Sequence, residues 1–205
     1  MAVVMGKRIG LRERLVIQET FSTFTLEGLV RFTIGILQFT LLAELVGAVL
    51  LTFRFVLDHP PLQAFYLGIF HSVSAFNNAG FSLFSSNLIA YRGDWVVNGV
   101  VMTLIILGGL GFLVYHDLLQ RLKKEVFRLS LHTKLVLITS LILIVIGAAA
   151  FLLFERLNPA TLQPLPFKEQ LLASIFQSVS ARTAGFNTVD IGALTTPTLY
   201  LLVLL

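Results

Sequence analysis

Three long apolar segments dominate the pattern of hydrophobic and polar residues along the chain. They run from Phe32 to about Leu57, from Trp95 to Tyr115 and from about Thr133 to Phe154. A hydrocarbon core of about 30 Å takes roughly 20 helical residues to cross, so each segment is long enough to span a membrane. Asp58-His59-Pro60-Pro61 ends the first segment, because proline cannot continue a helix interior. A fourth apolar segment begins near Thr196.

Two shorter apolar stretches do not fit a simple count of spanning helices. Leu62–Phe76 and Glu169–Arg182 are moderately apolar and contain Ser, Gln or His. Each is too short to cross a bilayer, and each is followed by a small, polar stretch that contains glycine. This pattern predicts two half-helices that enter the membrane and turn back.

The composition excludes a water-soluble domain and offers little to an enzyme. Hydrophobic residues make up 56% of the chain and charged residues 13%, whereas about a quarter of an ordinary soluble domain is charged. The absence of cysteine excludes disulfides, thiolate catalysis and cysteine metal sites. The four histidines have no zinc-ligand spacing, and neither a nucleophile elbow nor a phosphate-binding Gly-Lys-Thr occurs. We therefore expect a membrane protein that is not an enzyme.

The basic residues predict the topology. Residues 1–31 hold five Lys or Arg and residues 116–134 hold five more, against four in the two segments on the opposite side. Because cytoplasmic loops carry the excess of Lys and Arg, we expect residues 1–31 and 116–132 in the cytoplasm and Asp58–Pro61 and Asn158–Pro166 outside. The net charge of +4 then reflects topology, and we expect no nucleic-acid partner.

An internal repeat carries the functional argument. Phe70–Phe81 aligns with Phe176–Phe186 when one residue is gapped at Asn77 or Asn78, and eight of eleven aligned positions are identical. The copies lie about 105 residues apart, each between a spanning segment and a further apolar segment. The chain thus reads as helix, half-helix, turn and helix, followed by the same unit again. The alternative is a duplicated packing motif, in which small residues let helices approach.

The chemistry of such turns favours a cation path. Non-helical backbone at membrane depth is tolerated only where protein buries it or where it lines a water-filled path. Its carbonyl oxygens can replace the hydration shell of a cation. Glycine reaches the backbone angles that point successive carbonyls the same way, which gives Gly80 and Gly185 a role. The negative end of each half-helix dipole favours a cation beside it.

At these residues the chain resembles the Trk/Ktr/HKT potassium-transporter superfamily, and most of all its bacterial Ktr-type membrane subunit. Phe70–Phe81 and Phe176–Asp190 look like its second and third pore loops. The resemblance implies an all-α membrane protein of repeated helix–pore-loop–helix units, as in potassium channels, with pseudo-fourfold symmetry in the complete protein. It also implies two selectivity-filter segments whose backbone binds ions, namely Asn78, Ala79, Gly80 and Phe81, and Thr183, Ala184, Gly185 and Phe186.

The resemblance implies a function and an organisation of the chain. Its members take up potassium, so potassium is the expected ion, and sodium conduction or sodium coupling is the alternative. Further expectations are the bacterial cell membrane, a homodimer and a cytosolic nucleotide-binding regulatory subunit. The implied segments are a cytoplasmic connection (1–31), a pore unit with a re-entrant loop at 62–82 (32–115), a cytoplasmic basic loop (116–132), and a second pore unit with a re-entrant loop at 169–188 (133–205).

The family has four such units in one chain, whereas about one and a half are visible here. We therefore expect residues 1–205 to belong to a longer protein, and to insert into a membrane without conducting alone. In the family a glycine-rich gate lies in the helix that would follow Asn187. A structural subunit without a pore is a further alternative, which tracer flux would separate from a transporter.

Several single residues have two interpretations each. Glu44 is either a polar contact between helices or part of an ion path. Arg182, which directly precedes the second filter segment, either supports the filter by donating to backbone carbonyls or repels ions. His71 is expected to pack, with a pH sensor as the alternative. The glycines at 108, 109 and 111 favour close helix packing over a hinge, and the loop Arg121–Lys134 suits anionic lipids or a cytosolic regulator.

Overall fold

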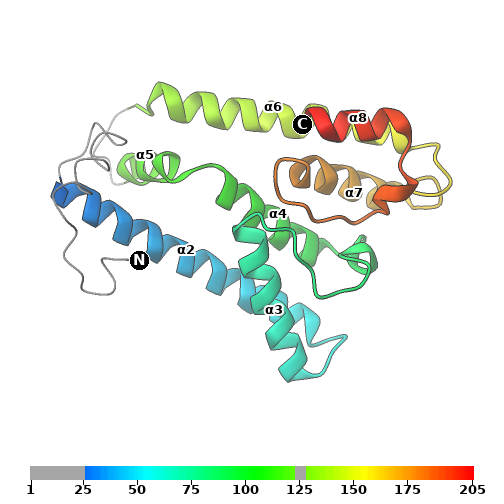
Figure 1. Ribbon diagram of the computed structural model, residues 1–205, viewed down its shortest axis with the longest axis horizontal. Helices are drawn as coiled ribbons and strands as arrows, with labels where there is room; N and C mark the ends of the chain where they lie inside the picture. The colour runs from blue at the N-terminus through cyan, green and yellow to red at the C-terminus, as the bar shows by residue number, and fades with distance from the viewer. Residues whose placement is uncertain (1–25, 123–127) are drawn as a thin grey trace. The chain divides into compact units, whose positions relative to one another are not determined.

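The computed structural model describes residues 26–122 and 128–205, and within these ranges it contains helices and no strand. This confirms the all-α prediction for the described residues. The chain divides into two compact units, residues 1–42 and 43–205, and α2 begins in the first and ends in the second. The helices, labelled in Figure 1, are α2 (Leu26–Phe55), α3 (Pro61–Phe76), α4 (Trp95–Gly109), α5 (Phe112–Leu122), α6 (Leu131–Glu155), α7 (Phe167–Ser180) and α8 (Thr196–Leu204).

Within the described part of the chain, two single helices are long and apolar enough to cross a membrane. They are α2, over Phe32–Phe55, and α6, over Leu131–Glu155. The first and third predicted spans are therefore confirmed as single helices. Most of the predicted cytoplasmic connection, residues 1–25, lies outside the described residues.

The second predicted span is bent: two helices that together are apolar enough for one broken span take the place of a single straight helix. It is broken into α4 and α5, whose axes differ by 98°. The break lies at Gly109-Leu110-Gly111, where Gly111 has φ +84. The apolar run hid the break, because glycine is apolar on a hydropathy scale and yet is the residue that most readily leaves the helical region.

The two predicted half-helices are present and short. α3 has 16 residues and α7 has 14, fewer than the roughly 20 that a crossing needs. Proline defines both starts, with Pro61 as the first residue of α3 and Pro166 as the N-cap of α7. Proline suits this position because the first N–H groups of a helix have no intrahelical partner.

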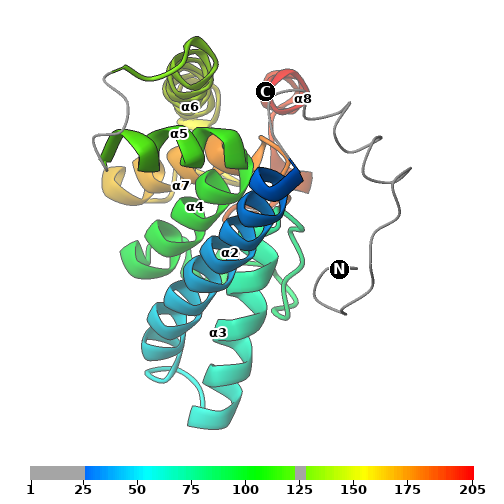
Figure 2. The ribbon, with the colours of Figure 1, turned by 90° about the vertical axis from the view of Figure 1, so that its left-hand side faces the viewer.

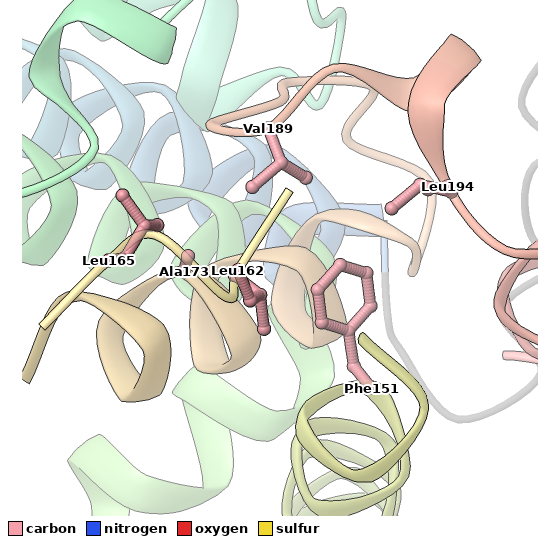
Figure 3. Packing of buried hydrophobic residues seen from close by; sticks show 6 residues of the cluster. All are labelled: Phe151, Leu162, Leu165, Ala173, Val189 and Leu194. Atoms are coloured by element: carbon pink, nitrogen blue, oxygen red, sulfur yellow. The ribbon is translucent and has the colours of Figure 1, made fainter. Parts of the chain in front are cut away.

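Within residues 43–205, α7 packs against both α6 and α4, and α8 packs against α6. Figures 1 and 2 both show α7 close to α6. A cluster of buried apolar residues joins these parts (Figure 3): Phe151 on α6, Ala173 on α7, Leu162 and Leu165 on the connection between them, and Val189 and Leu194 on the segment that precedes α8. The cluster thus packs the segment that follows α7 against the C-terminal part of α6.

The same packing device recurs in both halves of the repeat. The Ser72 hydroxyl on α3 donates to the Glu44 carbonyl of α2 at 2.6 Å, and Ser178 on α7 donates in the same way to α6 at 2.8 Å. Each serine also lies against a glycine of the long helix, where a Cβ would clash with its Oγ. These glycines, Gly47 and Gly147, let each half-helix approach the preceding helix closely.

Candidate functional site

The first predicted filter segment leaves the end of α3 through a tight turn. The N–H of Ala79 donates to the Ser74 carbonyl at 2.9 Å, and the Ser74 hydroxyl donates to the Phe81 carbonyl at 2.8 Å. Asn78 and Gly80 have φ values of 51° and 70°. One serine of the half-helix therefore fixes both ends of the turn.

The second predicted segment has the same geometry at the end of α7. The N–H of Ala184 donates to the Ser180 carbonyl at 2.9 Å, and the Ser180 hydroxyl donates to the Phe186 carbonyl. Thr183 and Gly185 have φ values of 83° and 78°. The repeat in sequence is thus a repeat of backbone conformation and of hydrogen bonds.

The backbone angles also place the gap in the repeat. Asn78 and Thr183 are the positive-φ residues that precede the matching alanines, so they are equivalent, and the extra residue of the first copy falls at Asn77. A non-glycine residue in this region is strained by roughly 1–3 kcal/mol and persists only where its surroundings hold it. For Thr183, with its β-branched side chain, such a φ is a clear outlier.

The structure brings the two predicted segments together. A Cβ built on Gly80 would lie 2.8 Å from Cα of Gly185, and one built on Gly185 would lie 3.3 Å from Cα of Gly80. The segments that follow also meet, since the N–H of Leu88 donates to the Asn187 carbonyl at 3.1 Å. All eight predicted filter residues therefore belong to two adjoining turns.

The residue before each turn is held by the preceding long helix. Asn77 Nδ2 donates to Glu44 Oε1 at 2.8 Å, and Arg182 Nη2 donates to the Ser140 hydroxyl at 2.9 Å. Glu44 therefore makes a polar contact between α2 and the end of α3, which agrees with the first of its two interpretations. For Arg182, the hydrogen bond found in the described part of the chain goes to α6 and not to a filter carbonyl.

A cavity of about 250 Å³ lies beside the second turn. Arg182 and Thr183 line it together with Gly109 at the end of α4. The neighbouring Gly108 packs against α3, because a Cβ there would lie 2.8 Å from the carbonyl carbon of Phe76. Gly108 thus has the predicted packing role, Gly111 provides the break between α4 and α5, and a hinge motion stays an untested alternative.

His71, near the end of α3, is fully buried. Its Nδ1 contacts the Leu67 carbonyl at 2.8 Å and its Nε2 contacts the Ser82 hydroxyl at 3.0 Å. The ring stacks on Phe84 with centroids 4.8 Å apart. This environment agrees with the expected packing role, since both ring nitrogens already have partners.

Charged residues connect the C-terminal end of α2 with the N-terminal end of α4. Arg54 at the end of α2 pairs with Asp94, the N-cap of α4, and with Asp58 at 2.7 Å. Its guanidinium lies over the ring of Tyr91. Burial, with a contribution from the Asp58 charge, raises the pKa of Tyr91 to about 12. Tyr91 therefore stays protonated and donates or accepts as a neutral hydroxyl.

A buried carboxylate plays the matching part in the second half. Glu155 at the end of α6 is fully buried and accepts from the backbone N–H of Thr195 at 2.8 Å and from its hydroxyl at 2.7 Å. Further hydrogen bonds come from Thr198 at 2.6 Å, Thr161 at 2.5 Å and Asn158 at 2.7 Å. Because Thr195 is the N-cap of α8, Glu155 fixes where α8 begins.

Sequence reasoning missed two features of this site. The roles of Ser74 and Ser180 had a signal, because both belong to the identical part of the repeat. The Glu155 cluster had a weaker one, a carboxylate at the end of an apolar segment with Thr and Asn nearby in the sequence. The participation of Thr195, 40 residues further on, had none.

Known proteins match nearly the whole chain. Residues 7–205 match the family model of TrkH, described as a cation transport protein. The chain is 39% identical over 203 residues to the Ktr system potassium uptake protein B of Bacillus subtilis, covering 99% of this chain and 45% of that protein. It is also 39% identical over 202 residues to the protein of the same name from Vibrio alginolyticus, with 98% and 44% covered.

A third relative differs in its stated ions. The potassium/sodium uptake protein NtpJ of Enterococcus hirae is 36% identical over 189 residues, with 91% of this chain and 41% of that protein covered. The chain thus spans less than half the length of these relatives. The family match and the apolar helices identify a multi-pass protein of the cell membrane. The chain belongs to the TrkH family of cation transport proteins.

Proposed function

We propose that this chain supplies two re-entrant pore loops to a pore through which potassium is taken up across the bacterial cell membrane. The observation that carries the proposal is the meeting of two turns of equal geometry at Gly80 and Gly185. Each turn follows a half-helix too short to cross a bilayer. Irregular backbone at that depth is buried in protein or lines a water-filled path, and a filter uses the second arrangement.

In this proposal the backbones of residues 78–81 and 183–186 form two parts of one selectivity filter. The serine at the end of each half-helix supports the arrangement, because its hydroxyl restrains the carbonyl of Phe81 or Phe186. A restrained carbonyl keeps its position when an ion arrives, so little reorganisation accompanies binding. Arg182 acts as a filter-supporting residue through Ser140 of α6.

Unequal burial of α3 and α7 supports a ring of more than two units. Val179 of α7 is 2% exposed and lines a cavity with Ile105 of α4, whereas the equivalent Val73 of α3 is 41% exposed. On α3 this face forms an apolar groove of about 730 Å³, which Ala79 and Phe81 also line. In the contact seen here, α4 of the first unit covers α7 of the second. If every unit covers the half-helix of the next unit in this way, these heterologous contacts can close into a ring.

We propose that the ring has pseudo-fourfold symmetry. Residues 32–115 and 133–205 then form two pore units, joined by a cytoplasmic loop at 116–132. The remaining units would come from the same polypeptide or from another chain. Because relatives are named as proteins of a Ktr system, we also propose a homodimer that works with a cytosolic nucleotide-binding regulatory subunit.

Sodium conduction or coupling is the second candidate function. The observation that favours it is the name of the Enterococcus hirae relative, a potassium/sodium uptake protein. Two glycines of the filter are visible in this chain, and they do not decide between the two ions.

The test is a chimera, because the chain matches less than half of its relatives. The part of this chain that aligns with the Bacillus subtilis relative would replace the matching segment of that protein. The product would be reconstituted into phospholipid vesicles. Uptake of tracer potassium and tracer sodium would be measured against the unmodified relative and against empty vesicles. We expect selective potassium uptake. Equal uptake of both ions would favour the second candidate, and an inserted protein without uptake of either would refute a pore role.

A further inference from the structure

The helix α5 has two unlike faces. Tyr115, Leu119 and Leu122 follow each other at helical spacing on one face. On the opposite face lie polar residues, namely His116, Asp117, Gln120 and Arg121. Neither α2 nor α6 has such a division, since both are apolar all around. An amphipathic helix of this kind suits a boundary between an apolar and an aqueous phase.

Its contact with α6 places α5 at the level of the membrane surface. The carboxylate of Asp117 accepts from the backbone N–H of Ser130 at 2.8 Å. Ser130 is the N-cap of α6, and its hydroxyl accepts from the N–H of Thr133. Because α6 is a membrane span that begins at Leu131, α5 lies where this span enters the bilayer.

The bend before α5 agrees with that position. α4 and α5 differ in direction by 98°, and Figure 1 shows α5 turned away from α4 near the beginning of α6. A helix that turned by this angle from a membrane-crossing course would run along the surface. The apolar segment from Trp95 to Tyr115 is thus divided between α4 and the beginning of a surface helix.

The apolar face of α5 is only partly covered by protein. Tyr115 is buried, whereas the exposed fractions of Leu119 and Leu122 are 50% and 78%. The covered part fixes the helix to its own chain. The uncovered part lies at the depth of the boundary between headgroups and acyl chains, where apolar side chains of a surface helix are normally buried in lipid.

Basic residues surround the contact between Asp117 and Ser130. Arg121 is one helical turn after Asp117, Arg128 is two residues before Ser130, and Lys134 is one turn after it, with its N–H donating to the Ser130 carbonyl at 3.1 Å. Arg128 and Lys134 are exposed. These three basic residues outnumber the single carboxylate of Asp117, so their net charge together is positive.

We propose that α5 and the start of α6 form a binding surface for anionic phospholipids. Leu119 and Leu122 enter the acyl boundary, and Arg121, Arg128 and Lys134 hold the phosphate groups. This surface needs only that the chain lies in a membrane, so it does not depend on the proposed potassium pore. A soluble protein partner would meet the same basic residues but would leave the two leucines shielded from lipid.

Quenching of a single tryptophan tests the proposal in the full chain. Trp95 is the sole tryptophan, and its quenching by brominated lipid in the native chain first reports insertion. In a Trp95→Phe background, Leu119→Trp is then compared with Gln120→Trp on the polar face. The vesicles contain phosphatidylcholine and phosphatidylglycerol, of which only one is brominated in each sample.

We expect strong quenching of Leu119→Trp and weak quenching of Gln120→Trp. Each basic residue near an anionic surface is worth about a fivefold gain in affinity, so brominated phosphatidylglycerol should quench severalfold better than brominated phosphatidylcholine. Replacing Arg121, Arg128 and Lys134 by Gln should remove this preference while Leu119→Trp remains quenched. The excess should also shrink as salt is raised.

Two outcomes would overturn the proposal. An unquenched Leu119→Trp in a chain whose Trp95 is quenched would mean that protein covers the apolar face, as a cytosolic partner or another part of the transporter would. Equal quenching by the two brominated lipids, unchanged in the Gln variant, would mean that the surface touches lipid without recognising anionic headgroups.

Discussion

Alanine at position 80 tests the contact between the two turns most directly. Gly80 and Gly185 have nearly the same φ, 70° and 78°, so a side chain at either position costs about 1–2 kcal/mol in the left-handed region. Their surroundings differ. The structure therefore predicts unequal effects for Gly80→Ala and Gly185→Ala, although the sequence gives both glycines the same place in the repeat.

The difference follows from what each new methyl group would meet. At position 80 it would lie 2.8 Å from Cα and 2.9 Å from the carbonyl carbon of Gly185. These are backbone atoms that cannot rotate away, and forced displacement in a packed region costs about 1–3 kcal/mol more. At position 185 the nearest atom is Cα of Gly80 at 3.3 Å, which a small shift relieves. Since 1.4 kcal/mol is a factor of ten, Gly80→Ala should be roughly tenfold more damaging.

The assay is the ratio of tracer potassium to tracer sodium uptake by the chimera in vesicles. Gly99→Ala is the matched control, because no neighbouring atom lies within 4 Å of a Cβ there and α4 continues through the position. We expect the ratio to fall most in Gly80→Ala, less in Gly185→Ala and not at all in Gly99→Ala. Equal effects of the first two, or the reverse order, would refute the close contact between the turns.

Three further predictions concern the frame around the turns. Glu155→Ala should lower the free energy of unfolding by about 3 kcal/mol, because it leaves buried donors without an acceptor. Thermal unfolding in detergent would measure this loss, with Glu169→Ala as the control. The ion pair of Glu169 with Arg92 is 3.7 Å long and partly exposed, so its loss should cost at most about 1 kcal/mol. Arg182→Ala should lower the potassium-to-sodium ratio if the residue supports the filter, whereas a residue that only repels ions would change the uptake rate at a constant ratio. Single cysteines at Arg128 and Gln163 should label with an impermeant thiol reagent from opposite sides of intact cells, only position 163 from outside, and outside labelling at 128 would contradict the topology.

The elements that the sequence predicted well are those with a local signal. The half-helices were predictable because proline marks both starts and because each stretch is too short to cross. The positions of the turns were predictable because the repeat is identical at its small residues. A glycine that must adopt positive φ cannot be replaced without strain, so two related turns retain it even when the surrounding residues differ.

Other features depend on contacts that a linear pattern does not contain. The break after Gly109 lies within an uninterrupted apolar run, and average hydropathy does not respond to backbone angles. The identical Ser-Val-Ser gave no sign that its serines act in opposite directions. Ser72 donates to the preceding helix and Ser74 to the Phe81 carbonyl, since residues two apart in a helix face different sides.

The two halves of the repeat connect equivalent helix ends through different interactions. In the first, Arg54 at the end of α2 pairs with Asp94, the N-cap of α4. In the second, Glu155 at the end of α6 accepts from Thr195, the N-cap of α8. Two helix ends can be held together by an ion pair or by a buried carboxylate with hydroxyl donors. Either interaction fixes the end of the long helix to the N-cap of the later helix. The turns do not tolerate such replacement, since their serines donate to backbone carbonyls and their glycines have positive φ. The repeat is therefore visible in the sequence at the turns. At the connected helix ends the structure repeats, but the residues that form the connection differ.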